Sequence, residues 1–345
     1  MTTTDQRLPS RTRHWLIADR PLGRALAATD FRLEEVPLPQ PAEGQVLLRT
    51  RYLSFDPSQK GMMENLASYA EPTDVGSVMP GQGIGEVLAS RSPEYAPGAL
   101  LRGPLGWREY AVLDAPRLEP VPEGVSPSVA LGVLGMTGLT AYIGLLHVGR
   151  PKPGDVLVIS GAAGAVGSIA GQIGRVGGCR VIGIAGGREK CESLVRELGF
   201  DAAIDYKSEK VRSRLRELCP GGIDVFFDNV GGTILNDCLA RLAPGARVVI
   251  CGGIARYNAD PRKPEQVPPG PQNYFGLVHT NATMQGFLVH HYVEHHPMAM
   301  QRLTAWLKDG AIRQKEDIVE GFENAPRALM RLFSGANVGK QLLKL

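Results

Sequence analysis

The stretch "SGAAGAVGS", residues 160–168, decides the fold of this chain. It follows "PGDVLVIS" (153–160), a short apolar run rich in β-branched residues that predicts a buried strand. Three glycines at three-residue spacing allow a tight turn and the close approach of a pyrophosphate, which the N–H groups of a following helix would bind. That helix is indicated by apolar residues at helical spacing: Val166, Ile169, Ala170, Ile173 and Val176. Strand, glycine loop and helix in this order predict a dinucleotide-binding site.

The alternation of strand and helix continues along the chain. Further strands are predicted at "CRVIGIA" (179–185), "AAID" (202–205), "IDVFFDNV" (223–230) and "ARVVICGG" (246–253). After the first of them, "REKCESLVREL" (188–198) indicates a helix that Gly199 stops. Buried strands that alternate with helices are typical of a parallel sheet covered on both faces, so we expect a doubly wound α/β domain.

The first 125 residues have a different pattern. Short strands broken by Pro and Gly favour a β-rich barrel or sandwich. The clearest strands are "RHWLIA" (13–18), "FRLEEV" (31–36), "QVLLRTRYLS" (45–54), "GIGEVLAS" (83–90) and "REYAVL" (108–113). The end of the chain turns to helix at "YVEHHPMAMQRLTAWLKDG" (292–310) and closes with a strand, "GKQLLKL" (339–345). We therefore expect a β-rich domain with the doubly wound domain inserted before its tail.

Composition excludes several classes of protein. The 345 residues are 43% hydrophobic and 21% charged, with a formal net charge of +3 and no long block of Lys or Arg, which argues against nucleic-acid or membrane-surface binding. No run approaches the ~18 apolar residues of a membrane span, and the N-terminal "MTTTDQRLPSRTRHW" has no apolar leader segment. Five scattered cysteines without a CxxC pair suit a reducing cytoplasm. These features predict a soluble protein of the cytoplasm.

The stretch "GIAGGREKCE" (183–192) lies where many dinucleotide-binding folds place the acid that binds the ribose 2′-hydroxyl of NAD. Here Gly186 and Gly187 leave room for a phosphate, which Lys190 or Arg188 can neutralise. The alternative is that these residues are only the polar start of a helix. Cations are mildly unfavourable at a helix N-terminus, so the stretch favours NADPH over NADH.

Two patterns bear on a metal. His291, Glu294 and His295 form H-x-x-E-H, the spacing of a zinc peptidase helix, but the third ligand is unspecified and a solvated, histidine-rich helix start explains the stretch. A catalytic zinc of the kind common in two-domain dehydrogenases needs Cys and His ligands from the β-rich domain. Before residue 150 the chain has no cysteine and only His14 and His147. We predict no metal.

Several stretches resemble the zinc-free double-bond reductases of the medium-chain dehydrogenase/reductase superfamily, a branch with prostaglandin reductases, plant alkenal reductases and bacterial curcumin reductases. They are "SGAAGAVGSIAGQIGR" (160–175), "GCRVIGIAGG" (178–187), "LGFDAAIDYK" (198–207), "FFDNVGG" (226–232), "CGGIARYN" (251–258), "MQGF" (284–287) and "IVEGFENAPRALMRLFSGANVGKQLLKL" (318–345). The resemblance implies an α/β chain with a β-rich GroES-like catalytic domain (1–127), a Rossmann NADPH-binding domain (128–289) and a C-terminal segment (290–345) that returns to the catalytic domain. It also implies a homodimer paired through the strand "ATMQGFLV" (282–289).

The resemblance also implies the cofactor-binding residues. It implies that the pyrophosphate is bound by Gly164, Ala165, Val166 and Gly167, and the 2′-phosphate end by Lys190 and Tyr206. Other implied cofactor contacts are Asn229, Cys251, Gly252, Ile254, Tyr257, Phe287, Leu288, Val289 and, on the nicotinamide side, Asn337. Each has a simpler alternative: the two asparagines as turn formers, the tyrosine at 206 as a cover of apolar core, and "GFLV" as only a strand.

The chain differs from many members of this branch at positions that the resemblance places near the substrate. Many of them have "DPYMR" where this chain has "DPSQK" (56–60), so an aromatic lid over the substrate is either missing or supplied by Tyr69. Several have a tyrosine, proposed as a proton donor, where this chain has His279, five residues before Met284. A histidine can donate a proton near neutral pH, although a plain surface residue is the alternative. Tyr257 is the other candidate acid.

The implied reaction is NADPH-dependent reduction of the C=C bond of an α,β-unsaturated ketone or aldehyde. Hydride adds to the β-carbon, charge develops on the carbonyl oxygen, and the α-carbon takes a proton. Two alternatives stay open: an NADPH-dependent quinone reductase and a non-catalytic NADPH-binding redox sensor. The sequence names no natural substrate, and it leaves open whether residues 255–275 form a lid.

Overall fold

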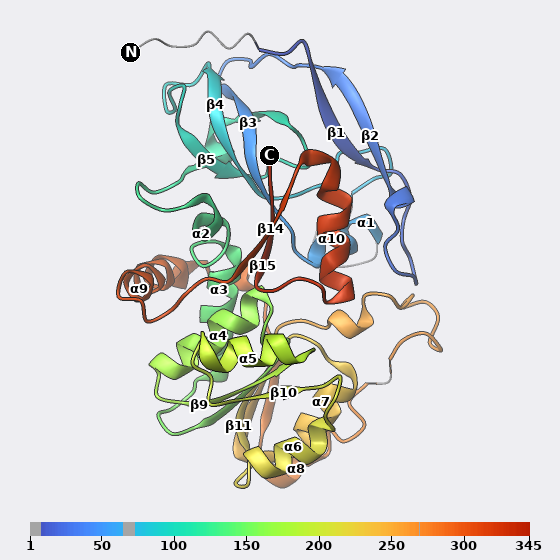
Figure 1. The fold of residues 1–345 in the computed structure, drawn as a ribbon, viewed down its shortest axis with the longest axis vertical. Helices are drawn as coiled ribbons and strands as arrows, with labels where there is room; N and C mark the ends of the chain where they lie inside the picture. The colour runs from blue at the N-terminus through green and yellow to red at the C-terminus, as the bar shows by residue number, and fades with distance from the viewer. Residues whose placement is uncertain (1–7, 65–72, 269) are drawn as a thin grey trace.

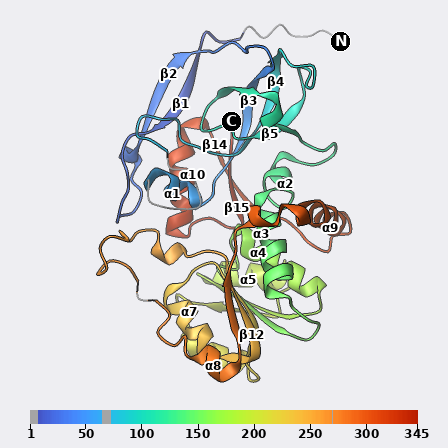
Figure 2. The ribbon, with the colours of Figure 1, turned by 180° about the vertical axis from the view of Figure 1, so that it is seen from behind.

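The computed structural model describes residues 8–64, 73–268 and 270–345, and it shows two domains stacked along the long axis of the molecule (Figure 1). Tyr69 lies outside the described residues. Within the described part of the chain, no helix is both long and apolar enough to cross a membrane. The backbone passes from the β-rich domain into the second domain and then returns, so that the first and last described residues both lie in the first (Figures 1 and 2).

The second domain is built on a six-stranded parallel sheet with the strand order β10-β9-β8-β11-β12-β13. This is the Rossmann order, in which the direction of winding reverses beside the first strand, β8. The strands are β8 (Val156–Ser160), β9 (Arg180–Ala185), β10 (Ala202–Asp205), β11 (Ile223–Asp228), β12 (Leu242–Ile250) and β13 (Thr283–Gly286). Their connections contain α4 (Ala165–Val176), α5 (Arg188–Arg196), α6 (Val211–Leu218), α7 (Gly232–Leu239), a short helix, η4 (Ile254–Arg256), and α8 (Gly276–Thr280).

Side chains of the parallel strands fill two cores, one on each face of the sheet. Phe226 packs with Leu215 and Leu239 of α6 and α7, whereas its neighbour Phe227 packs with Ile169 and other residues of the opposite face. Both phenylalanines are fully buried. Successive side chains of a strand point to opposite faces, so a strand covered on both sides is apolar at every position. The continuous apolar runs in the sequence predicted these strands correctly for this reason.

The β-rich domain contains a seven-stranded sheet in the order β14-β15-β3-β4-β5-β7, with β6 paired to β3, and a separate antiparallel pair, β1-β2. The strands are β1 (Arg11–Ile17), β2 (Phe31–Pro37), β3 (Gln45–Ser54), β4 (Gly83–Ser90), β5 (Leu100–Gly103), β6 (Tyr110–Asp114), β7 (Glu119–Pro120), β14 (Glu316–Glu320) and β15 (Lys340–Lys344). Two helices lie on the side of this domain that faces the Rossmann domain, α1 (Ser58–Glu64) and α10 (Ala325–Ser334) (Figure 1).

The segments near the predicted domain boundaries pack against both domains. Residues 127–131 form α2 (Pro127–Leu131), whose Ala130 and Leu131 pack with Ile84 of the β-rich domain. At the other end, the predicted C-terminal segment is divided between the domains. Its first part packs in the Rossmann core through α9 (His296–Lys308), with Leu303 among the buried residues, beside α3 (Met136–Ile143). The later part, with β14, a short helix η6 (Phe322–Asn324), α10 and β15, returns to the β-rich domain.

Candidate cofactor and substrate site

The glycine loop lies at the carboxyl end of β8, where the winding of the sheet reverses. Gly161 has a φ of +59°, and Gly164 is the N-terminal cap of α4. A side chain at Gly167 would place its Cβ 2.5 Å from the carbonyl oxygen of Gly161, so the turn is closed too tightly for any other residue there. No side chain of the described residues caps α4, which leaves N–H groups of its first turn for an anionic ligand.

A buried carboxylate holds the strand ends that carry this loop. Asp228, at the end of β11, accepts hydrogen bonds from the Ser160 hydroxyl at 2.6 Å and from the backbone N–H of Gly231 at 3.0 Å. Burial raises the pKa of the Asp228 carboxyl, and these hydrogen bonds partly offset the shift. The neighbouring Asn229 donates its side-chain amide to the Ser160 carbonyl at 2.7 Å. Asn229 therefore lies beside the loop, with its side-chain amide bonded to the end of β8. Sequence reasoning missed the roles of Ser160 and Asp228.

The carboxyl end of β9 forms the second part of the site. Gly186 lies so close to the Tyr206 ring that a Cβ would be 2.8 Å from the phenol. The Lys190 ammonium donates to the carbonyl oxygens of Gly335 at 2.7 Å and Asn337 at 2.6 Å, which leaves one of its three N–H bonds for another acceptor. Burial lowers the pKa of Lys190, and the nearby Lys207 lowers it further. A half-buried cation beside a glycine turn is well suited to a phosphate.

Arg188, the other candidate cation, is directed elsewhere. Its guanidinium is 88% exposed and pairs with Glu192 one helical turn along. No acidic residue directly follows β9, but one lies close by at the end of β10. There the Asp205 carboxylate accepts a hydrogen bond from the backbone N–H of Gly187 at 2.7 Å. This hydrogen bond is the main reason that the pKa of Asp205 is lowered. The carboxylate thus fixes the turn that carries Lys190.

The segments after β12 and β13 complete the carboxyl side of the sheet. Cys251 and Gly252 both donate their backbone N–H to the Asp228 carbonyl, at 2.9 and 3.0 Å, and Ile254 donates to Asn229. Burial raises the pKa of the Cys251 thiol to about 12, so it stays protonated. Tyr257 follows η4, and its ring contacts Phe333 of α10 with centroids 5.6 Å apart.

The "GFLV" segment follows β13, and its three predicted residues, Phe287, Leu288 and Val289, are each partly exposed. The Phe287 ring lies over Gly144, where a Cβ would be 2.5 Å from the ring edge, and it packs with Val289 in the Rossmann core. The segment thus lies at the carboxyl end of the sheet, where Phe287 packs against the core.

The C-terminal tail returns to the glycine loop. Gly339 donates its backbone N–H to the Ala163 carbonyl at 2.8 Å and forms an isolated parallel bridge with Gly164. Asn337 lies two residues earlier, and its backbone carbonyl accepts a hydrogen bond from the Lys190 ammonium. The side-chain amide of Asn337 donates to the Gly339 carbonyl at 3.0 Å. The structure therefore brings Asn337 to the site, next to Lys190.

His279 is not brought to the site. It is exposed on α8, which precedes β13 and so lies at the amino end of the parallel strands. Figures 1 and 2 show α8 at the end of the Rossmann domain farthest from the β-rich domain. The His279 ring contacts only Phe275 edge-on among the ring pairs of the described residues. Of the two candidate acids, Tyr257 alone lies at the junction of the domains.

The H-x-x-E-H stretch does not form the helix face that a zinc peptidase would need. Residues 289–295 form a 3₁₀ segment, η5 (Val289–His295), interrupted at Tyr292 by a φ of −124°, and α9 begins only at His296. The His295 ring stacks on His147 at 4.1 Å between centroids. Among the described residues, no group of three or more His, Cys, Asp or Glu side chains is arranged to hold a metal ion.

The "DPSQK" segment forms the start of α1, at the junction of the domains. Asp56 accepts from the Lys340 ammonium at 2.6 Å, and the Gln59 amide donates to the Pro80 carbonyl at 2.8 Å. Gln59 and Lys60 are both buried, and Ser58 is partly exposed at the first position of the helix.

Comparison with known proteins agrees with this geometry. Residues 13–121 match the family described as the N-terminal domain of oxidoreductase, and residues 165–308 match the family described as zinc-binding dehydrogenase. The chain is 41% identical to the NADPH-dependent curcumin reductase of Escherichia coli over 343 residues, 97% of each chain. It is 37% identical to the NADP⁺-dependent 2-alkenal reductase of Nicotiana tabacum over 302 residues, 86% of each chain.

The crystal structure of CurA from Vibrio vulnificus in complex with NADPH superposes with a TM-score of 0.90, at 42% identity, over 96% of this chain and 98% of that one. The chain belongs to the NADPH-dependent double-bond reductase branch of the medium-chain dehydrogenase/reductase superfamily. This double-bond reductase is thus an oxidoreductase with NADPH as its cofactor. The resemblance, the fold class and the cofactor expected from the sequence are confirmed.

The glycine loop of the reductase generates a testable expectation. Gly167→Ala places a methyl group against the Gly161 carbonyl, a backbone atom that cannot rotate away. We expect the NADPH dissociation constant to rise at least about tenfold, equivalent to ~1.4 kcal/mol, as measured by titration of nicotinamide fluorescence. Gly221→Ala is the matched control, because no atom lies within 4 Å of a Cβ there. Equal affinities for both variants would contradict this account of the loop.

Proposed function

We propose that the protein reduces the C=C bond of α,β-unsaturated ketones or aldehydes with NADPH, and without a metal. The observation that carries the proposal is the joining of three segments at one place: the glycine loop, the Lys190 turn and the Tyr257 segment, held together by Asp228 and by the returning tail. Relatives named as curcumin reductase and 2-alkenal reductase, similar over nearly the whole chain, support this substrate class.

Each part of the site has a task in this reaction. When bound, NADPH supplies the hydride that adds to the β-carbon, and a proton at the α-carbon completes the saturated carbonyl product. The α4 N-terminus and Lys190 bind the phosphates and so fix the orientation of the cofactor. Tyr257, at the junction of the domains, offers a phenol as a hydrogen-bond donor to the carbonyl oxygen on which charge develops.

The two alternatives have weaker support. Solved quinone oxidoreductases, such as the one from Escherichia coli complexed with NADPH, match at 20% identity and a TM-score of 0.75, which demonstrates a shared fold alone. A non-catalytic sensor would require only the phosphate-binding half of the site. The Tyr257 segment, which is tied to both domains, favours an enzyme over a sensor.

We further propose a cytoplasmic location. All five cysteines are free in the structure, and burial raises the pKa of the thiols of Cys179, Cys191 and Cys219 to about 11. Buried, protonated thiols without a disulfide partner suit a reducing compartment.

The preference for NADPH should depend on Lys190. We expect Lys190→Ala to raise KM for NADPH roughly ten- to a hundredfold, because a charge-assisted hydrogen bond to the 2′-phosphate is lost, while KM for NADH changes little. Arg188→Ala is the matched control, since that guanidinium is exposed and paired with Glu192. Initial rates with the two cofactors measure the effect. Equal use of NADH by the unmodified protein would contradict the assignment of the phosphate site.

The substrate and the acid are tested together. An enone and a quinone are assayed separately, each with NADPH and excess EDTA. We expect the absorbance of the reduced nicotinamide, at about 340 nm, to decay when the enone is the substrate. Tyr257→Phe should lower the enone turnover number by about tenfold or more, the scale of one lost donor to a developing oxyanion. His279→Gln serves as the control and should leave the rate unchanged, since His279 lies at the far end of the sheet. Turnover of the quinone alone would favour the quinone reductase, and tight NADPH binding without turnover would favour the sensor.

We also propose a homodimer through β13. This strand is the last in the six-stranded sheet, and all four of its residues are exposed, including Met284. An open edge strand presents unpaired N–H and C=O groups, which a second copy would satisfy. Met284→Glu should convert the dimer into a monomer in light scattering, because a two-fold axis brings equal charges together. Val195→Glu, on α5 near the opposite edge, should remain dimeric. A monomeric unmodified protein would rule the proposal out.

A further inference from the structure

Lys60 is a fully buried lysine with no part in binding the cofactor phosphates. Its side chain is 0% exposed, and its ammonium donates to the Pro21 carbonyl at 3.3 Å, to the Glu64 carboxylate one helical turn along α1, and to the Tyr257 carbonyl. These three acceptors match the three N–H bonds of an ammonium group. Two acceptors belong to the catalytic domain and the third, Tyr257, to the Rossmann domain. Lys60 therefore joins the two domains at the residue that carries the candidate acid.

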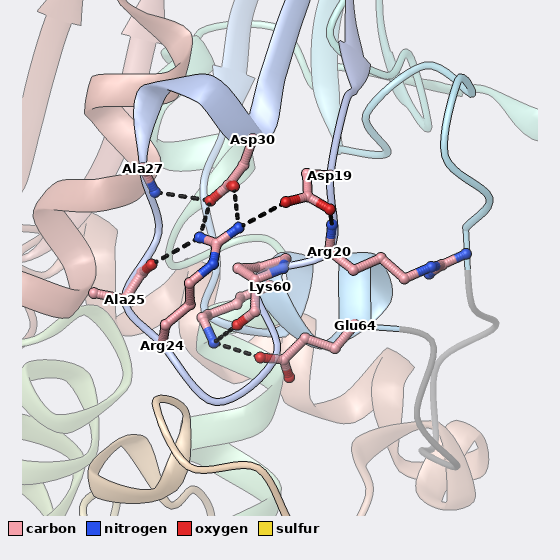
Figure 3. Close-up of polar contacts among 9 residues, drawn as sticks. Asp19, Arg20, Arg24, Ala25, Ala27, Asp30, Lys60 and Glu64 are labelled. Carbon is pink, nitrogen blue, oxygen red and sulfur yellow. Dashed lines mark hydrogen bonds and ion pairs between the residues drawn. The ribbon is translucent and has the colours of Figure 1, made fainter.

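The carboxylate that balances Lys60 is also shielded from water. Glu64 is 8% exposed, and burial raises the pKa of its carboxyl, an effect that Lys60 opposes and the nearby Asp260 reinforces. Figure 3 shows Lys60 and Glu64 pointing toward one another from α1. A buried charge of this kind persists only where its partners are held in place.

A second contact lies beside the first. The loop around Gly23, which has a φ of +67°, approaches the Rossmann domain so closely that a Cβ would be 2.8 Å from the Gln266 amide oxygen and 2.9 Å from Asp260. Arg24 holds this loop by two hydrogen bonds to the buried Asp30 carboxylate, at 2.9 and 2.5 Å (Figure 3). The 257–266 segment thus rests against a loop that the Arg24–Asp30 pair holds in its conformation.

The 257–266 segment is itself cross-braced. Asp260 is 4% exposed. Its carboxylate accepts hydrogen bonds from the backbone N–H and the guanidinium of Arg262, at 2.9 to 3.0 Å. The backbone N–H of Asp260 donates to the Gln266 amide oxygen at 3.2 Å. The Tyr257 ring meanwhile packs on Phe333 of the catalytic domain. The segment contacts the catalytic domain at three places: Lys60, the Gly23 loop and Phe333.

We propose that Lys60 is a positioning residue that clamps the 257–266 segment to the catalytic domain and thereby fixes Tyr257 relative to substrate and cofactor. The role rests on the proposed function, because it acts through Tyr257. It assigns to the "DPSQK" segment a task other than covering the substrate. It also makes residues 257–266 a fixed wall of the site, held on the catalytic-domain side, rather than a lid that opens freely.

The test replaces the charged pair by an apolar one. Lys60→Met alone would leave Glu64 buried without its partner and would endanger folding, whereas Lys60→Met with Glu64→Leu removes the bond to Tyr257 and leaves no orphan charge. Hydrogen exchange of the 257–266 amides, measured without substrate, reports on the clamp. Steady-state kinetics with NADPH and an enone report on the position of Tyr257.

For the double variant we expect exchange of the 257–266 amides to accelerate about tenfold or more, and the enone turnover number to fall about tenfold. KM for NADPH should change less than about threefold, because the glycine loop and Lys190 still bind the phosphates. The single variant Lys60→Arg keeps the charge and the donors, so it should retain the slow exchange and the turnover number of the unmodified protein. Lys340→Met removes a buried lysine whose acceptors, Phe55 and Asp56, lie within the catalytic domain, so it should leave exchange of the 257–266 amides unchanged.

Two results would overturn the clamp: unchanged exchange in the double variant, or faster exchange with an unchanged turnover number. The exchange measurement needs no substrate. If the unmodified protein reduces no enone, the proposed function fails while the attachment of the segment by Lys60 is still decided by exchange. If it reduces enones normally and the double variant does so equally well, the clamp fails and the proposed function stands.

Discussion

The return of the C-terminal strand to the catalytic sheet is the constraint on which the arrangement of the domains depends. β15 lies between β14 and β3, and the residue before it, Gly339, bonds the glycine loop of the other domain. One strand therefore sets the position of the phosphate-binding loop relative to the β-rich sheet. The carbonyls of Gly335 and Asn337 on the same tail bind Lys190. A ligand phosphate at this turn would bind to a lysine that the catalytic domain already holds in place.

Beside the ring contact of Tyr257 with Phe333, several contacts between the domains are polar and directional. Gly339, Lys190 and Lys60 each bond backbone carbonyls across the boundary. A hydrogen bond of this kind has a narrow range of distance and angle, whereas apolar contact tolerates sliding. Hydride transfer requires the reacting carbons at near-contact distance, so an enzyme that builds its site between two domains benefits from attachments that fix register. Lys190 and Lys60 lie on opposite sides of the glycine loop in sequence, and each fixes one segment of the site.

Much of the fold could be predicted from the sequence, because its signals are local. The parallel strands from β8 to β12 are continuous apolar runs, and the glycine loop has its meaning from the strand and helix around it. The network below the loop was missed because Ser160 and Asp228 lie 68 residues apart; an acid that ends a buried apolar strand was the only signal. α1 was missed for another reason: Gln59 and Lys60 are polar yet buried, against the usual preference for solvent. His279 was misplaced because its assignment came from spacing to Met284, and spacing does not show that a helix lies at the amino end of a strand.

The buried pair of Lys60 and Glu64 illustrates how stability and position can be separated. Replacing a buried ion pair by well-packed apolar residues is often neutral or stabilising by about 1–4 kcal/mol, so stability alone does not account for a lysine at this position. A methionine would fill the same volume in α1 without any cost of desolvation. It could not, however, donate to the Tyr257 carbonyl, and the 257–266 segment would lose a bond that has both a length and a direction. The desolvation of Lys60 is offset within α1 by Glu64, and what remains is a donor aimed across the domain boundary. The chain thus accepts a buried charge where it needs a fixed distance between two domains.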